Sequence, residues 1–285
     1  MSWKMARFYF SVAVVSLLVV MLLSGRAAAV LVIASDDASQ SAYNDGWQIG
    51  DNGGTGFAAW STINNQAGSG SGGGFLANSN GESHINTSGK AFGVFGHHGG
   101  VGQAIRSFSN PISVGHTFSL KMDNGLINDS GNSQGGGTVG FGLRNSSGNN
   151  LFEFFFVGGQ SEYKVNGSGG SVGTGVSFTN EGLELAFTLT GTNSFSFVIH
   201  KLIDNAGVNT TITGNLMSPS GGQAISQLRL FNANAGEPNE NNAFYNSFSV
   251  TAIPEASAVG FFSVAIIVTT ATTSLCRRRS ARRAS

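Results

Sequence analysis

The chain has 285 residues, of which 42 are glycine and only 11% are charged, less than half of the roughly 25% that is usual in soluble proteins. Between residues 30 and 252 there are 7 basic and 14 acidic residues, which gives this part a net charge of −7. Because an acidic domain repels phosphate backbones, the charge excludes nucleic acid as a partner of the folded part.

Residues 1–29 have the pattern of a secretory signal peptide. A basic start is followed by an uncharged, mostly apolar run from Phe8 to Leu23, and then Ala27 and Ala29 form a small-x-small cleavage site. We expect export by the Sec machinery and cleavage by signal peptidase after Ala29, with a site near Ala34 as the alternative. An uncleaved anchor is disfavoured, because the apolar run is shorter than the roughly 20 residues of a membrane span.

Three aromatic residues early in the exported part, Tyr43, Trp47 and Trp60, are candidates for glycan contact. Large rings with a polar edge can stack on sugar rings and hydrogen-bond beside them. The alternative is that they fill the hydrophobic core, which is the usual position of large aromatic side chains.

Four aspartates in oxygen-rich loops, Asp36, Asp37, Asp45 and Asp51, are weak candidates for calcium binding. Calcium takes six to eight oxygen ligands from carboxylates, amides and backbone carbonyls. The alternative is turn formation, for which aspartate, asparagine and glycine are the usual residues. No other cofactor is expected, and no zinc motif with four ligands at suitable spacing is present.

The segment 66–74 is a low-complexity run of glycine and serine. It could link two domains, but residues 30–65 alone offer too little apolar surface for a core of their own. We therefore expect a long loop within one domain over 30–252.

Most of residues 30–252 reads as β-strands. Apolar and polar residues alternate with period two, as in strands that bury one face, over residues 117–122, 139–144, 183–189, 195–200 and 248–250. No stretch shows a helical period. These patterns predict an all-β fold, one antiparallel β-sandwich of about ten strands.

The run Leu151–Val157 is almost continuously apolar and predicts a central strand that is covered on both faces. The polar loop Asn145–Asn150 before it predicts a hairpin with the strand over 139–144.

A catalytic group of acids is not visible in the sequence. Jelly-roll glycosidases need a close pair of carboxyls, but Glu181 and Glu184 are three residues apart, which places them on opposite faces of a strand. Glu153, between phenylalanines, is the most interesting acid and needs a partner, for which Arg144 is a candidate. Glu153 with Glu184 is the pair to inspect first.

Residues 253–285 have the features of a membrane-sorting tail. The uncharged segment 256–276 is long enough for one transmembrane helix, and Arg277, Arg278 and Arg279 follow it directly. An arginine cluster stays on the cytoplasmic side, so the bulk of the chain lies outside, in agreement with the signal peptide. The one cysteine, Cys276, lies in this tail, so an intrachain disulfide is excluded.

This tail, with Pro254-Glu255-Ala256, an apolar span and an arginine-rich end, resembles the PEP-CTERM sorting signal of Gram-negative bacteria. Ala256 stands where that signal has a second proline. The resemblance implies anchoring in the inner membrane, then recognition by an exosortase, removal of the tail, and a location at the cell surface or in the extracellular matrix with exopolysaccharide. A plain anchor that is never cut is the alternative.

The part between the two ends resembles an ectodomain that recurs with PEP-CTERM tails. The similarity covers roughly 31–252 and rests on segments such as Asp45-Gly46-Trp47, Gly140–Asn145 and Arg229-Leu230-Phe231. In appearance it is similar to concanavalin-like jelly rolls, whose members include lectins and glucanases. We expect a non-enzymatic surface or matrix protein, with a jelly-roll carbohydrate-active enzyme, a glycoside hydrolase or lyase, as the alternative.

Overall fold

The computed structural model describes residues 29–65, 70–79, 84–127, 137–203, 209–237 and 239–252. Almost all of them belong to one compact unit, Leu31–Ala252. The sorting motif at 254–256, the expected transmembrane segment 256–276, the arginine cluster and residues 1–28 lie outside these ranges. Within the described ranges, none of the helices has the length and apolar character needed to cross a membrane.

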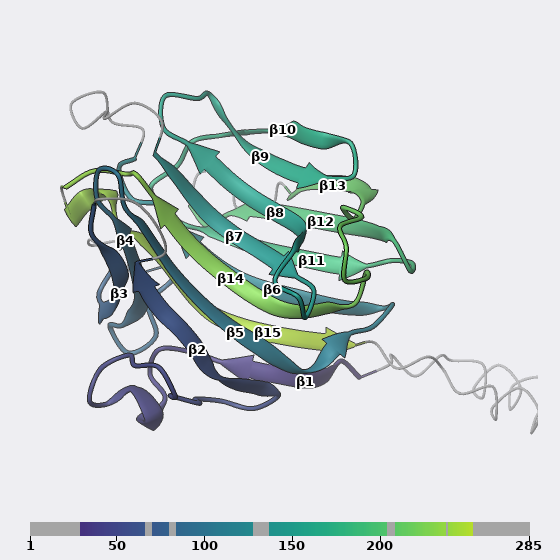
Figure 1. The fold of residues 1–285 in the computed structure, drawn as a ribbon, viewed down its shortest axis with the longest axis horizontal. Helices are drawn as coiled ribbons and strands as arrows, with labels where there is room; N and C mark the ends of the chain where they lie inside the picture. Colours follow the sequence, from purple (N-terminus) through teal and green to yellow (C-terminus); the bar gives the residue numbers. More distant parts are fainter. Residues whose placement is uncertain are drawn as a thin grey trace, which may run out of the picture. The chain divides into compact units, whose positions relative to one another are not determined.

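The unit Leu31–Ala252 is an all-β sandwich of two sheets that lie one over the other (Figure 1), and all strand pairs are antiparallel. The eight-stranded sheet has the order β13 (Asn209–Asn215), β12 (Ser194–Lys201), β11 (Leu183–Leu189), β6 (His116–Asp123), β15 (Ala243–Ala252), β4 (Ala91–Gly96) and β3 (Gly72–Ala77), and β1 (Leu31–Asp36) also pairs with β15. The seven-stranded sheet has the order β10 (Gly170–Ser177), β9 (Glu162–Gly167), β8 (Asn150–Val157), β7 (Thr138–Arg144), β14 (Ile225–Ala233), β5 (Val101–Ile112) and β2 (Phe57–Asn65). Two 3-10 turns, η1 (Ser41–Tyr43) and η2 (Asn239–Asn241), are the helical elements of the described ranges.

The core lies between the two sheets and is rich in phenylalanine. Every second residue of β8, including Phe152 and Phe154, is buried and meets phenylalanines of the eight-stranded sheet. The ring centres of Phe152 and Phe187 are 4.8 Å apart, and those of Phe154 and Phe197 are 5.1 Å apart. Each such side chain contributes about 1.5–3 kcal/mol through burial, so the alternation in the sequence is what fixes the two layers.

The predicted strands are confirmed as elements of this sandwich. The segment 183–189 coincides with β11, and those over 117–122, 139–144, 195–200 and 248–250 lie in β6, β7, β12 and β15. The predicted hairpin joins β7 and β8. The described ranges contain fifteen strands, more than the ten or so expected.

Two expectations about individual segments are wrong. The last three residues of the glycine-rich run 66–74 belong to β3. A Cβ atom at Gly72 would lie 2.5 Å from the backbone nitrogen of Gly102, so this strand position needs glycine. Glycine there permits two backbones to approach closely, which is a strand role as well as a loop role. β8 is not covered on both faces: its second face, with Glu153 and Phe155, is only half-buried, and no described strand packs over it.

Candidate functional site

The outward-facing residues of β8, β7 and β14 form a charged row on the open face of the seven-stranded sheet. Glu153 on β8 is directly opposite Gly142 on β7, and Gly142 is directly opposite Arg229 on β14. Neighbouring strands are about 4.8 Å apart, so the backbones of Glu153 and Arg229 are about 10 Å apart. The glycine between them has no side chain to fill this gap.

The two glycines of β7 that face outward differ in their surroundings. A Cβ atom at Gly140 would lie 2.1 Å from the carbonyl oxygen of Phe154, so this position accepts only glycine. A Cβ atom at Gly142 would meet nothing closer than 3.5 Å, where Cγ of Glu153 lies. Gly142 is itself buried, so the side chains of its neighbours pack over this position at ordinary contact distance.

Glu153 is held in place by two amides. Its Oε1 accepts a hydrogen bond from Nδ2 of Asn150, and its Oε2 accepts one from Nδ2 of Asn166 at 3.1 Å. The sequence suggests Arg144 as the partner of Glu153. The two groups attract each other electrostatically, because Glu153 raises the pKa of Arg144 against the larger lowering effect of burial. The amides fix the direction of the carboxylate, while the arginine supplies positive charge nearby.

Two arginines stand close to this carboxylate. Burial lowers the pKa of Arg229, the positive charge of Arg144 lowers it further, and Glu153 opposes both effects. Burial also lowers the pKa of Arg144. Nε of Arg229 donates to Oε1 of Gln103 at 3.0 Å, and its guanidinium carbon lies 4.8 Å from the ring centre of Phe231. Arg144, in contrast, has a buried Nε with no hydrogen-bond partner.

We call Arg144, Glu153 and Arg229, with their neighbours Gln103, Asn150 and Asn166, the charged cluster. Its two arginines repel each other and face one carboxylate, so the three charged groups have a net positive charge within an acidic domain. Such an arrangement stabilises an anion, because each guanidinium has donors that can form paired hydrogen bonds with a carboxylate.

The three aromatic candidates for glycan contact are in the core. Trp60 and Tyr43 are at most 1% exposed and Trp47 is 6% exposed. The two tryptophan rings meet edge to face at 4.8 Å, and Trp47 also meets Phe92 at 4.9 Å. With their faces covered, these rings are not available to a sugar in the structure, so the alternative core position is the one observed.

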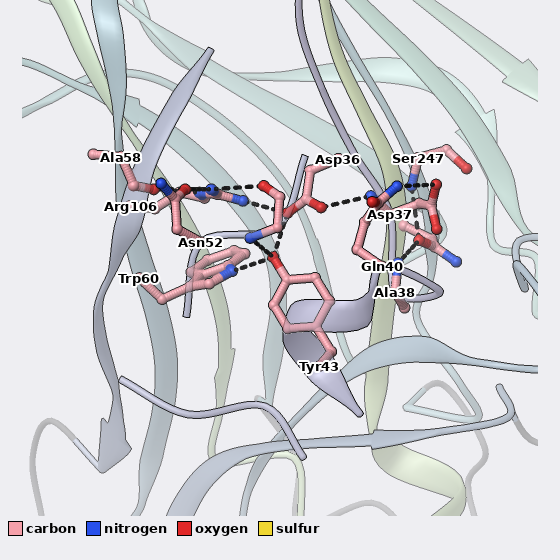
Figure 2. A network of polar contacts seen from close by, with 12 residues as sticks. Asp36, Asp37, Ala38, Gln40, Tyr43, Asn52, Ala58, Trp60, Arg106 and Ser247 are labelled. Carbon is pink, nitrogen blue, oxygen red and sulfur yellow. Dashed lines mark hydrogen bonds and ion pairs between the residues drawn. The ribbon is translucent and has the colours of Figure 1, made fainter. Parts of the chain in front are cut away.

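Asp36 lies in a buried polar network that joins the two sheets (Figure 2). It forms an ion pair with Arg106 of β5, and both side chains are fully buried. The hydroxyl of Tyr43 donates to Asp36 and accepts from Nε1 of Trp60 at 3.2 Å, while Nη2 of Arg106 donates to Asn52 at 3.1 Å. Burial raises the pKa of Asp36, against the lowering effect of the Tyr43 hydrogen bond and the Arg106 charge.

The other calcium candidates do not meet Asp36 in a common site. Asp37 accepts hydrogen bonds from the backbone and hydroxyl of Ser39, and Asp51 accepts one from the backbone nitrogen of Gln48 at 2.8 Å. These are turn contacts. Over the described part of the chain, no group of three or more histidine, cysteine, aspartate or glutamate side chains could hold a metal ion.

The carboxylate pair suggested for a glycosidase is not formed. Glu153 faces outward from the seven-stranded sheet, and Glu184 faces outward from β11 of the eight-stranded sheet. Packed sheets are about 10 Å apart and the two side chains point away from each other, so their carboxyls exceed the roughly 5–9.5 Å of such pairs.

Sequence reasoning missed Gln103 and Asn166, and it did not connect Arg229 with Glu153. Arg229 stands between the buried Leu228 and Leu230, a pattern that marks an outward position on a strand. What the sequence does not contain is the register that brings β14 beside β7.

No protein-family model matches the chain, and no curated protein matches its sequence. Among solved structures, a family 7 alginate lyase in complex with product is similar over 59% of this chain and 82% of its own, with 12% identity and a TM-score of 0.36. An endo-1,3-β-glucanase from Streptomyces sioyaensis is similar over 77% of this chain and 89% of its own, with 13% identity and a TM-score of 0.37. A winged bean acidic lectin complexed with methyl-α-D-galactose is similar over 67% and 92%, with 13% identity and a TM-score of 0.38.

These comparisons correct the expectation of a non-enzymatic protein. The similar structures include alginate lyases and β-1,3-glucanases, which agrees with the alternative, a jelly-roll carbohydrate-active enzyme. Because the TM-scores of these structures are below 0.4, they identify no residue, substrate or reaction for this chain. The function proposed below therefore rests on the charged cluster.

Proposed function

We propose that the chain is an exported carbohydrate-active enzyme of the jelly-roll type that cleaves an acidic polysaccharide at the charged cluster. One observation carries the proposal: two arginines and one amide-held carboxylate lie together on the face of the seven-stranded sheet that no described strand covers.

The substrate class follows from the charges. The domain has a net charge of −7, so a polyanion is repelled everywhere except where positive groups gather. The Nε of Arg144 is buried and has no hydrogen-bond partner. The positive charges of Arg144 and Arg229 repel each other, which lowers the pKa of Arg229. A uronate carboxylate between the two guanidiniums would relieve this repulsion by adding a negative charge between them.

The reaction class follows from the number of carboxylates. Hydrolysis by the usual route needs two carboxyls within about 9.5 Å. On the described part of this face, the next carboxylate along β9 is Glu162, about 13 Å by strand rise from Asn166, the partner of Glu153. Glu162 is already bonded to the backbone nitrogen of Gly175. A single carboxylate base with cationic neighbours suits β-elimination from a uronate better than it suits hydrolysis.

In this reaction Glu153 accepts the proton from C5 of the uronate. The C4–O bond to the preceding sugar breaks as the C4=C5 double bond forms, and the proton then passes to the departing oxygen. Arg144 and Arg229 stabilise the negative charge that develops on the uronate carboxylate in the transition state. Stabilisation by such fixed charges is usually the largest single contribution to catalysis. Asn150 and Asn166 hold Glu153 in position.

The location is part of the proposal. The signal peptide pattern at 1–29 and the PEP-CTERM-like tail at 253–285 support export, sorting by an exosortase and contact with exopolysaccharide. The intact mass of the protein from its native host tests this. We expect a chain that starts near Val30 and lacks most of residues 256–285, whereas a mass that includes the arginine cluster would refute sorting with cleavage.

The activity is tested with the purified full chain on polymannuronate, polyguluronate and polygalacturonate. We expect an unsaturated product, measured by ultraviolet absorbance, from at least one of them. Glu153→Gln should lower the rate by about 10²–10⁴-fold, the usual contribution of a general base.

The matched control is Glu184→Gln, the same change on the outer face of the other sheet. It should leave the rate within about twofold of the unmodified chain. No product from any of the three polymers, or an equal loss in both variants, would contradict the proposed function.

A further inference from the structure

A pocket lies on the opposite side of the sandwich from the charged cluster. It has a volume of about 420 Å³ and lies on the outer face of the eight-stranded sheet, where β3, β4 and β15 pair. Phe75 and Phe95 provide its apolar wall beside Phe244, which is itself buried, and Asn78, Asn242 and His97 are among its polar lining. We call it the aromatic pocket. Its volume is within the range of about 300–1,000 Å³ that is typical of small-molecule sites.

Glycines on the pleated surface create the space for these rings. Gly93 of β4 is paired with Phe75 on one side and with Phe244 on the other. A Cβ atom at Gly93 would lie 2.5 Å from the ring of Phe75, so any side chain there would push the ring away. The rings of Phe75 and Phe244 meet at 83° with centres 5.7 Å apart, and Phe95 lies 6.2 Å from Phe75.

The polar part of the lining consists of asparagine amides and one histidine. Nδ1 of His97 lies 2.7 Å from Oγ of Ser71 and 3.3 Å from the carboxylate of Glu237, and these contacts fix the ring at the edge of the pocket. The side chain of Asn78 accepts a hydrogen bond from Asn86 at 3.2 Å, which holds its amide. Each amide offers both a donor and an acceptor.

From this combination we infer that the aromatic pocket binds a neutral saccharide unit. Apolar ring faces suit the C–H faces of a pyranose, and amides that both donate and accept suit its hydroxyls. None of the lining residues is an arginine or lysine, so a uronate would lack there the paired guanidinium donors that it meets at the charged cluster. An acyl chain is a poorer occupant. It would remove water from the amides and offer no hydrogen bonds in place of those that the amides had made to water.

The pocket and the charged cluster are on opposite faces of one sandwich, so both can be occupied at once. A chain that cuts an acidic polymer on one face would thus hold a neutral glycan on the other. This inference goes beyond the proposed function and does not depend on it, because the two sites share no residue.

The test is titration calorimetry of the purified full chain with maltohexaose, cellohexaose and laminarihexaose as neutral probes, and with decanoate as an apolar probe. We expect at least one hexasaccharide to bind. Phe95→Ala should weaken that binding at least about tenfold, as truncation of a central contact residue does. Ala77→Phe, which fills the pocket without removing a ring, should have a similar effect.

Glu153→Gln serves as the control, since it disables the proposed reaction on the other face and should leave neutral-glycan binding within about twofold. The converse comparison, cleavage of a polyuronate by the Ala77→Phe variant, separates failure of this inference from failure of the proposed function. Binding of decanoate alone, no binding of any hexasaccharide, or hexasaccharide binding that Ala77→Phe and Phe95→Ala leave unchanged would each overturn the inference.

Discussion

Two groups of arginine and acid in this molecule have opposite surroundings. In the core, Arg106 is paired with Asp36, and hydrogen bonds from Tyr43 and to Asn52 complete the network (Figure 2). On the open face of the seven-stranded sheet, Arg144 has a donor without a partner and faces a second arginine. The comparison teaches that completeness separates a structural charge pair from a binding site.

The physical reason is the cost of leaving a buried charge without a partner. In the core no water can replace a missing contact, so every donor of Arg106 must be satisfied within the protein. At the charged cluster, two arginines face one carboxylate, so an anion from outside could balance the excess positive charge. The complete network around Arg106 needs no such addition and serves stability.

The largest expected effect is therefore in the core. Asp36→Ala leaves the guanidinium of Arg106 buried and unpaired between the sheets, which should lower the free energy of unfolding by about 3–5 kcal/mol. Urea unfolding of the chain, followed by tryptophan fluorescence, measures this, since Trp47 and Trp60 pack beside the network. A loss below about 1 kcal/mol would show that the network is not what joins the two sheets there.

The open cluster should respond much less in the same experiment. Arg229→Ala removes a cation that already repels Arg144, so the loss of its contacts with Gln103 and Phe231 is partly offset. We expect a change in unfolding free energy of about 1 kcal/mol or less, together with a large loss of polyuronate cleavage. Destabilisation as large as that of Asp36→Ala would make Arg229 a structural residue and end the distinction drawn between the two groups.

Much of the fold could be predicted from the sequence, because burial of one face imposes a period of two that is visible in Leu183–Leu189 and its neighbours. Glu153 could be singled out as well, since a carboxylate among phenylalanines needs an explanation. Its neighbours could not, because Arg229 reaches Glu153 only through the pairing of β14, β7 and β8, and strand register over such separations is not encoded locally.

The aromatic residues show the other limit of sequence reasoning. Trp47 and Trp60 are residues of the type that stacks on sugar rings, but the same large aromatic side chains also fill hydrophobic cores. Meanwhile Phe75, which lines a pocket together with Phe95, directly follows the glycine-rich run 66–74 that the sequence predicts to be a loop. Glycine there marks the close approach of neighbouring strands and rings, a cause that only the paired structure reveals.

The most direct test of the charged cluster is a crystal structure of the Glu153→Gln variant soaked with a hexauronate that the unmodified chain cleaves. The account predicts a uronate carboxylate between the guanidiniums of Arg144 and Arg229, with C5 of the sugar ring beside the substituted side chain at position 153. An oligosaccharide bound elsewhere on the sandwich, with Arg144 and Arg229 untouched, would contradict it.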